Sequence, residues 1–130
     1  MPDPKPPRTD DMSNCPCAGG TLDKLIQPAI LIILSECGMH GYALVGRLSE
    51  MPMFAGDKPD PSGVYRLLKA MEGRGIVTSS WDTSQGGPAK RTYEITNPGR
   101  ACLRAWINTL EGYRDAINLL LRAARSATET

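Results

Sequence analysis

The residues whose types could do chemistry together lie between Asp60 and Val77 of this 130-residue chain. Apolar residues recur there at helical spacing, at Val64, Leu67, Leu68 and Met71, and predict one buried face. The opposite face would then carry Ser62, Arg66 and Lys69, flanked by Tyr65. Gly63 lies near the start of this face and has no side chain that would project from it. Cationic and hydroxyl groups can donate hydrogen bonds to phosphates and base edges, and the major groove of DNA admits one helix. We therefore expect a DNA contact from Ser62, Gly63, Tyr65, Arg66 and Lys69.

The middle of the chain is locally positive, although the formal net charge of the whole is only +1. Seven basic residues stand against three acidic ones between residues 62 and 104. A polyanion-binding surface has such an excess, but so has an ordinary solvated surface, and charge alone favours neither.

The elements that would position these residues can be read along the chain. Residues 1–20 are rich in proline, aspartate and glycine and predict a disordered arm. Leu22–Cys37 predicts a helix that is buried all round and ends at Gly38, and Gly41–Glu50 predicts a second helix. Its inner stripe would consist of Tyr42, Leu44, Val45 and Leu48. Asp60 is a suitable N-cap for the third helix, which would run from Pro61 to Glu72.

Two alternating runs, IVTSSW and KRTYEIT, surround a Gly-Gly-Pro tip and predict an antiparallel hairpin. Lys90 and Arg91 follow the tip and could lie against phosphates beside the groove. The order of helix, helix, helix, hairpin and long helix predicts a mainly α fold with a small β-hairpin, a winged helix-turn-helix. We expect it to span residues 21–96.

Residues 97–130 predict a long final helix with a heptad seam of apolar residues. The seam consists of Leu103, Trp106, Leu110, Tyr113, Ile117, Leu120 and Ala124. A body this small cannot bury so long a seam, so we expect a homodimer held by Leu103, Ile117 and Leu120. Paired Trp106, Leu110 and Tyr113 could hold a planar effector, or Trp106 could simply pack the dimer core.

The cysteines suggest a second sensor. Cys15 and Cys17 are one residue apart and could bind a soft metal or form a redox pair. A closed zinc site needs four ligands, and Cys37 and His40 could complete one. The motif also fits an arm that holds nothing, so no cofactor is required.

Catalysis has little support in this sequence. The single histidine, His40, is expected at a helix start, and Asp10 and Asp11 lie in the predicted disordered arm. No nucleophile has a base at readable spacing, so we expect that the chain is not an enzyme. The N-terminus lacks a signal-peptide pattern and the run AILIIL is too short to cross a membrane, which predicts a cytoplasmic protein.

Between Ile30 and Trp106 the chain resembles the PadR family of transcriptional regulators, through MHGYALVGRL, PSGVYRLLKAMEGRGIV, SSW and GGPAKRTYEITNPGRACLRAW. The resemblance implies a homodimeric repressor of near-palindromic double-stranded operators that a small effector releases. It maps the recognition helix onto residues 61–72 and the wing onto residues 84–93, and adds Tyr42 to the expected DNA contacts. Pro88 and Ala89 depart from the arginines that many members carry at the wing tip.

Two functions from different classes follow from this sequence. The first is a sequence-specific transcriptional regulator released by a small-molecule, metal or redox signal. The alternative is a winged-helix adaptor that binds proteins without sequence-specific DNA binding, because a fold alone does not fix a function.

Overall fold

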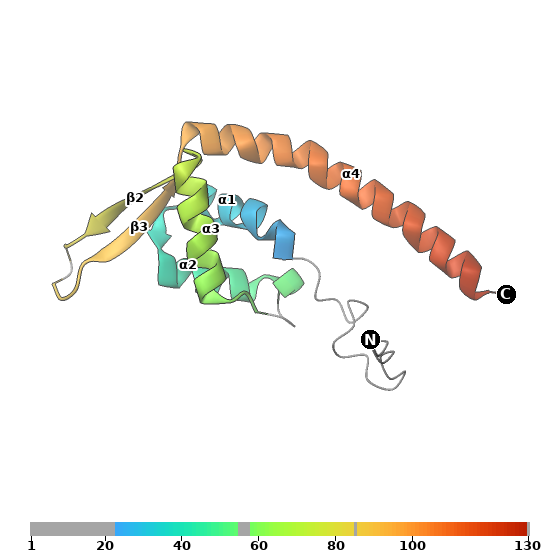
Figure 1. Ribbon diagram of the computed structural model, residues 1–130, viewed down its shortest axis with the longest axis horizontal. Coiled ribbons are helices and arrows are strands. Elements are labelled where there is room, and N and C mark those ends of the chain that lie inside the picture. Colours follow the sequence, from blue (N-terminus) through green and yellow to red (C-terminus); the bar gives the residue numbers. More distant parts are fainter. Residues whose placement is uncertain (1–22, 55–57, 85, 130) are drawn as a thin grey trace, which may run out of the picture.

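The computed structural model describes residues 23–54, 58–84 and 86–129. The helices are η2 (Asp23–Leu25), α1 (Ile26–Glu36), α2 (Gly41–Glu50), η3 (Pro52–Phe54), α3 (Pro61–Gly73) and α4 (Asn97–Thr128). The strands are β1 (Met39–His40), β2 (Val77–Asp82) and β3 (Lys90–Ile95). The expected class, mainly α with a β-hairpin wing and a long last helix, is confirmed (Figure 1). Among the described residues, no helix is both long and apolar enough to cross a membrane.

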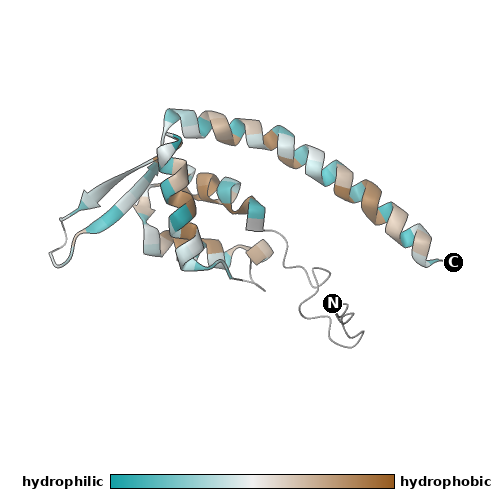
Figure 2. Ribbon diagram, viewed as in Figure 1, coloured by the Kyte–Doolittle hydropathy of each residue, from teal (hydrophilic) through white to brown (hydrophobic). Residues whose placement is uncertain are grey.

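One hydrophobic core joins α1, α2, α3 and the base of the sheet. Its fully buried members include Ile30, Leu31, Leu34, Leu44, Leu48, Leu68 and Met71. Figure 2 shows hydrophobic segments where these three helices meet, whereas the strands of the wing are mostly hydrophilic. The core thus fixes the helices and leaves the outer part of the hairpin in solvent.

The first helix differs from expectation in two ways. Ile32 is 40% exposed, so α1 is not buried all round. Gly38 does not end the helix, because α1 stops at Glu36 and Cys37 is already extended. Gly38 instead allows a close approach, since a Cβ atom there would lie 2.7 Å from Cγ of Glu94 and 3.0 Å from the carbonyl oxygen of Tyr93.

The sheet has three antiparallel strands in the order β1-β3-β2, with β3 in the centre. The predicted hairpin is confirmed, with Ser79 opposite Tyr93 and Trp81 opposite Arg91. The short strand β1 was not predicted, because two residues are too few to show alternation. It pairs His40 with Thr92 and so attaches the start of α2 to the wing.

The second and third helices have nearly the predicted bounds. Asp60 caps α3 by accepting a hydrogen bond of 3.3 Å from the backbone N–H of Gly63, and Pro61 is the first helical residue. The inner stripe predicted for α2 was wrong at one position. Leu44 and Leu48 are buried, but Tyr42 is 88% exposed.

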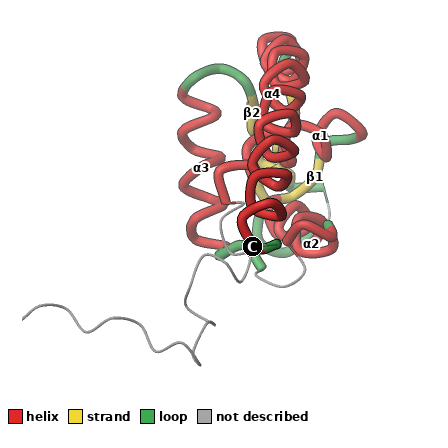
Figure 3. The backbone as a smooth tube through the Cα atoms, turned by 90° about the vertical axis from the view of Figure 1, so that its right-hand side faces the viewer, coloured by secondary structure: helices red, strands yellow, loops and turns green. Residues whose placement is uncertain are grey.

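The last helix begins in contact with the sheet and then leaves the body. Thr96 caps it by accepting a hydrogen bond of 3.0 Å from the N–H of Gly99. A Cβ atom at Gly99 would collide with the carbonyl oxygen of Ile76, so glycine lets α4 start against the backbone of the hairpin. Its C-terminal half then extends beyond the other helices (Figure 1), and Figure 3 looks nearly along it, with α3 on one side and α1 and α2 on the other.

Candidate nucleic-acid interface

The exposed face of α3 carries the residues that were predicted to contact DNA. Val64, Leu68 and Met71 are buried, and the helix turns Ser62, Arg66 and Lys69 away from them into solvent. Within the described part of the chain, neither Arg66 nor Lys69 forms an ion pair. Both cations are therefore available to an anionic partner.

Tyr65 stands beside this face and is held by a glycine of α2. A Cβ atom at Gly41 would lie 2.5 Å from Cε1 and 3.1 Å from the hydroxyl oxygen of Tyr65. The ring can thus lie against the first turn of α2 only because residue 41 has no side chain. This contact explains a glycine between His40 and Tyr42 and leaves Tyr65 41% exposed.

A pocket of about 490 Å³ lies between the start of α2, α3 and β3. Four of the predicted DNA contacts line it, namely Tyr42, Tyr65, Lys90 and Arg91, together with His40, Gly41, Ala43 and Tyr93. The fold therefore brings together predicted DNA contacts, Tyr42 and Arg91, that are 49 positions apart in the sequence. The pocket is lined by tyrosine hydroxyl groups and a lysine ammonium group, and it lies beside the N-terminal end of α2. These groups together favour the binding of an anion.

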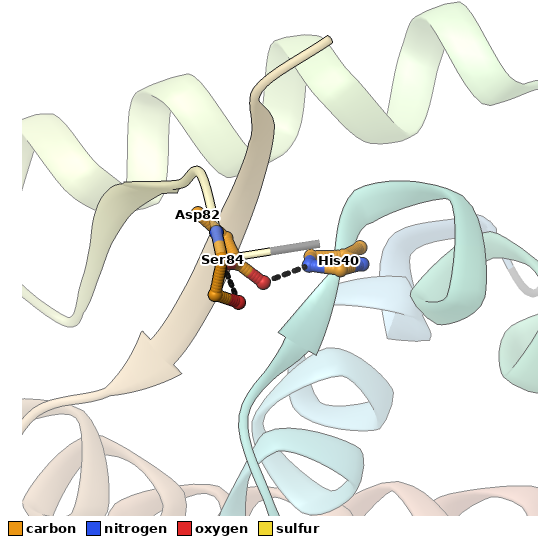
Figure 4. Close-up of polar contacts among 3 residues, drawn as sticks. All are labelled: His40, Asp82 and Ser84. Atoms are coloured by element: carbon orange, nitrogen blue, oxygen red, sulfur yellow. Dashed lines mark hydrogen bonds and ion pairs between the residues drawn. The ribbon is translucent and has the colours of Figure 1, made fainter. Parts of the chain in front are cut away.

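The base of the wing is tied to the start of α2 through His40. Its Nε2 atom lies 3.1 Å from Oδ2 of Asp82, which stands at the end of β2 (Figure 4). The other carboxylate oxygen of Asp82 accepts hydrogen bonds from the N–H (3.0 Å) and the hydroxyl (2.6 Å) of Ser84. These bonds hold the chain where it leaves β2 toward the wing tip.

We expect this contact to be visible in the titration of Asp82. The hydrogen bonds from Ser84, and then that from His40, lower the pKa of Asp82 from 3.8 to about 2. Because the folded pKa is below the ordinary value, the contact stabilises the wing above pH 4 and is lost as the pH falls from about 4 to about 2. The carboxyl carbon of Asp82, followed by NMR, should titrate near 2.

Two variants separate the contributions to this pKa. Ser84→Ala should move the midpoint upward toward 3.8 by more than His40→Gln does, because the Ser84 bonds are the larger cause. A parent protein in which Asp82 titrated near 3.8 would show that the contact does not form in solution.

Arg91 is engaged within the chain and is only half-exposed. Its Nη2 atom lies 2.9 Å from Oε1 of Glu72 on α3, and its Nε donates to the hydroxyl of Ser79 at 2.8 Å. Lys90, the neighbouring predicted contact, is exposed and has no ion pair with any described residue. The two basic wing residues thus differ in their surroundings.

The predicted seam of α4 divides into a packed part and an exposed part. Leu103 and Trp106 pack against the core of their own chain, and Leu110 is half-buried. Tyr113, Ile117 and Leu120 are 50%, 59% and 70% exposed. The apolar stripe therefore continues beyond the point where α4 leaves the body.

The predicted metal or redox pair, Cys15 and Cys17, lies outside the described residues. Of the two cysteines that the structure does describe, Cys37 is exposed and Cys102 is half-buried. No cluster of three or more potential metal ligands occurs in the described ranges, so Cys37 and His40 have no further ligand there.

Some elements of this surface were missed by the sequence-based interpretation. Glu72 and Ser79 were read as parts of a helix and a strand, and Asp82 as part of a loop. The signal that could have found Glu72 is its position, because it is the one acid on α3 and follows two basic residues. Its partner Arg91 is 19 positions away, so only the fold reveals the contact.

Comparison with known proteins identifies the family of this chain. The sequence model of the "Transcriptional regulator PadR-like family" matches residues 30–105, which is more than half of the chain. "Probable transcriptional regulator Rv1176c" of Mycobacterium tuberculosis is 33% identical over 79 residues, or 61% of this chain. The chain spans about two fifths of the length of that relative (41%).

Solved structures have the same fold. A regulator described as putative, TA0346 of Thermoplasma acidophilum, is 34% identical, with a TM-score of 0.65 over 77% of this chain and 93% of its own. A PadR-like regulator of Bacillus cereus is 24% identical, with a TM-score of 0.65 over 77% of this chain and 94% of its own. Bacillus subtilis PadR, solved in complex with operator DNA, is 23% identical, with a TM-score of 0.57 over 65% of this chain and 46% of its own. The chain belongs to the PadR-like family of transcriptional regulators.

Proposed function

We propose that this protein is a homodimeric, sequence-specific DNA-binding repressor that a small-molecule, metal or redox signal releases from a near-palindromic operator. Residues 21–96 would form the DNA-binding domain and residues 97–130 the dimerisation helix, whereas the arm predicted for residues 1–20 lies outside the described residues. Such a protein would act in the cytoplasm, where its DNA is. Family membership supports a role in transcription, and the operator complex of Bacillus subtilis PadR supports DNA as the partner.

The observation that carries the proposal is the exposed face of α3. Two cations without ion pairs among the described residues, Arg66 and Lys69, lie beside a serine on a helix whose other face is anchored in the core. A rigid helix can enter the major groove and present such groups to base edges and phosphates. Because the core fixes α3, its exposed side chains would already have this arrangement before DNA binds.

The pocket beside α3 suits the phosphate backbone next to that groove. Tyr42, Tyr65 and Lys90 line it and all three are exposed. A phosphate seated there would accept hydrogen bonds from them near the N-terminal end of α2. This arrangement would fix the register of α3 in the groove.

The effector site is proposed at the seam of α4, where Trp106 and Leu110 are half-buried and Tyr113 is half-exposed. A two-fold pair of these side chains would offer flat apolar surfaces to a planar ligand. Cys15 and Cys17 remain the second candidate for a signal, through a metal or a thiol pair.

Selection of bound duplexes from a random DNA pool tests the proposal directly. A regulator should enrich a near-palindromic sequence and keep it at physiological salt, with an affinity that falls by several logarithmic units per unit of log salt. An adaptor should enrich no sequence and lose DNA at moderate salt. Dimerisation and release by an effector would then be measured with the selected duplex.

A substitution at Gly63 tests independently whether DNA lies close to the first turn of α3. A Cβ atom there would be 3.8 Å from Oδ2 of Asp60, an ordinary contact, so Gly63→Ala should fold and be more stable by up to about 1 kcal/mol. If DNA lies against this turn, the added methyl group should nevertheless weaken binding. Calorimetry and DNA titration would measure the two effects, and unchanged DNA affinity would contradict the predicted contact.

A further inference from the structure

Glu72 is an acid in the helix that is proposed to approach DNA, and its surroundings are unusual. It lies in the last turn of α3 and is only 29% exposed. Its Oε2 accepts a hydrogen bond from the hydroxyl of Ser79 on β2, and its Oε1 is 2.9 Å from Nη2 of Arg91 on β3. The carboxylate therefore connects the recognition helix to both strands of the wing.

Arg91 completes this cluster from the wing. Its Nε donates to the hydroxyl of Ser79 at 2.8 Å, so the three side chains form a closed ring of contacts. The guanidinium carbon also lies 5.8 Å from the ring centres of both Trp81 and Tyr93, within the range of a cation–π contact. Four groups thus restrain one guanidinium.

The register of the sheet explains why these groups meet. Trp81 pairs with Arg91 and Ser79 pairs with Tyr93, and residues two apart in a strand share a face. All four side chains therefore stand on one face of the hairpin, the face toward Glu72. Lys90, one residue before Arg91, alternates to the other face and remains exposed.

We propose that Glu72 and Arg91 are positioning residues, which fix the wing relative to α3, and that the phosphate contact of the wing is made by Lys90. This inference rests on the proposed DNA-binding function and changes one predicted contact, because Arg91 acts through the wing and not on DNA. An ion pair is suited to the task, since its two charges largely cancel and add little to the field that DNA meets.

A pure charge effect and a positioning role predict opposite changes in DNA affinity when Glu72 is removed. Removal of an acid near a polyanion should strengthen DNA binding if charge alone matters. Loss of a positioning residue should weaken it, because the wing and α3 would no longer be held at one spacing. Glu72→Ala therefore separates the two explanations, and Glu72→Gln removes the charge while keeping the size and acceptor oxygen of the side chain.

The experiment measures affinity for one half-site of the selected duplex, which a single protomer contacts, as a function of salt. We expect Glu72→Ala and Arg91→Ala each to weaken binding about fivefold, the factor for an ion-pair network worth about 1 kcal/mol. The double variant should be no weaker than the worse single variant, because both remove the same contact. Arg91→Ala should leave the salt slope unchanged, whereas Lys90→Ala should reduce it by about 0.9.

A second measurement needs no DNA. In the free protein, hydrogen exchange of the β2 and β3 amides should accelerate in Glu72→Ala and Arg91→Ala, less in Glu72→Gln, and not in Lys90→Ala. If the pool yielded no duplex, the proposed function would fail while this exchange result still tested the positioning role. Tighter binding by Glu72→Ala, a lower salt slope in Arg91→Ala, or unchanged exchange in both would overturn the inference.

Discussion

The variant Arg66→Ala/Lys69→Ala should bind the selected operator at least about 30-fold more weakly than the parent. Each residue is expected to contribute about 1–3 kcal/mol through a base or phosphate contact, and 1.4 kcal/mol is a factor of ten. Both side chains are exposed and lie opposite the buried Val64, Leu68 and Met71. The substitutions should therefore leave the core and the thermal midpoint nearly unchanged, while fluorescence titration with labelled duplex reports the loss.

A matched control removes the same charge elsewhere. Arg122→Ala/Arg125→Ala also deletes two cations, from the exposed end of α4 and off the predicted seam. We expect parent-like DNA affinity from it. Equal weakening in both double variants would show that total charge, and not the face of α3, determines binding.

The local features of the fold could be predicted because neighbouring residues determine them. Asp60 followed by Pro61 indicates a helix start, and the predicted third helix differs from α3 by a single residue at its end. The hairpin was predicted from alternation around Gly86 and Gly87, which do adopt positive φ angles of 63° and 82°. The apolar spacing within α3 likewise predicted its buried and exposed faces.

The features that were missed depend on partners far along the chain. Tyr42 was assigned to the inner stripe of its helix together with Leu44 and Leu48, but it is exposed and lines the pocket beside the wing. Gly38 was read as a helix stop, although its role is to admit Glu94 and Tyr93 of β3. The contact of Glu72 with Arg91 and that of His40 with Asp82 require the three-stranded register, which two residues of β1 cannot indicate by themselves.

Ile117→Lys should convert the proposed dimer to monomer at micromolar concentration. Ile117 is 59% exposed on the part of α4 that has left the body, so in one chain its side chain has no core to fill. Burial of an isoleucine side chain is worth about 1.5–3 kcal/mol, and two-fold symmetry applies the loss twice. The dissociation constant measured by sedimentation equilibrium should rise about 100-fold or more.

The neighbouring residue offers a matched control. Asn118→Lys adds the same charge one position along the helix, on an exposed side that points away from the seam. It should sediment as the parent does. Because this end of α4 is remote from the core, circular dichroism should show a folded winged-helix part in both variants, and an unchanged dimer in Ile117→Lys would reject the seam as the interface.

Loss of the dimer should also lower the affinity for operator DNA, although Ile117 is far from α3. A near-palindromic operator engages two recognition helices, and the second binds at the high effective concentration that the dimer creates. Ile117→Lys should therefore weaken binding to the full operator while leaving the affinity for an isolated half-site unchanged. Asn118→Lys should alter neither. Equal loss at half-site and full operator would instead mean that α4 shapes the DNA-binding part itself, through the close contact of Gly99 with Ile76.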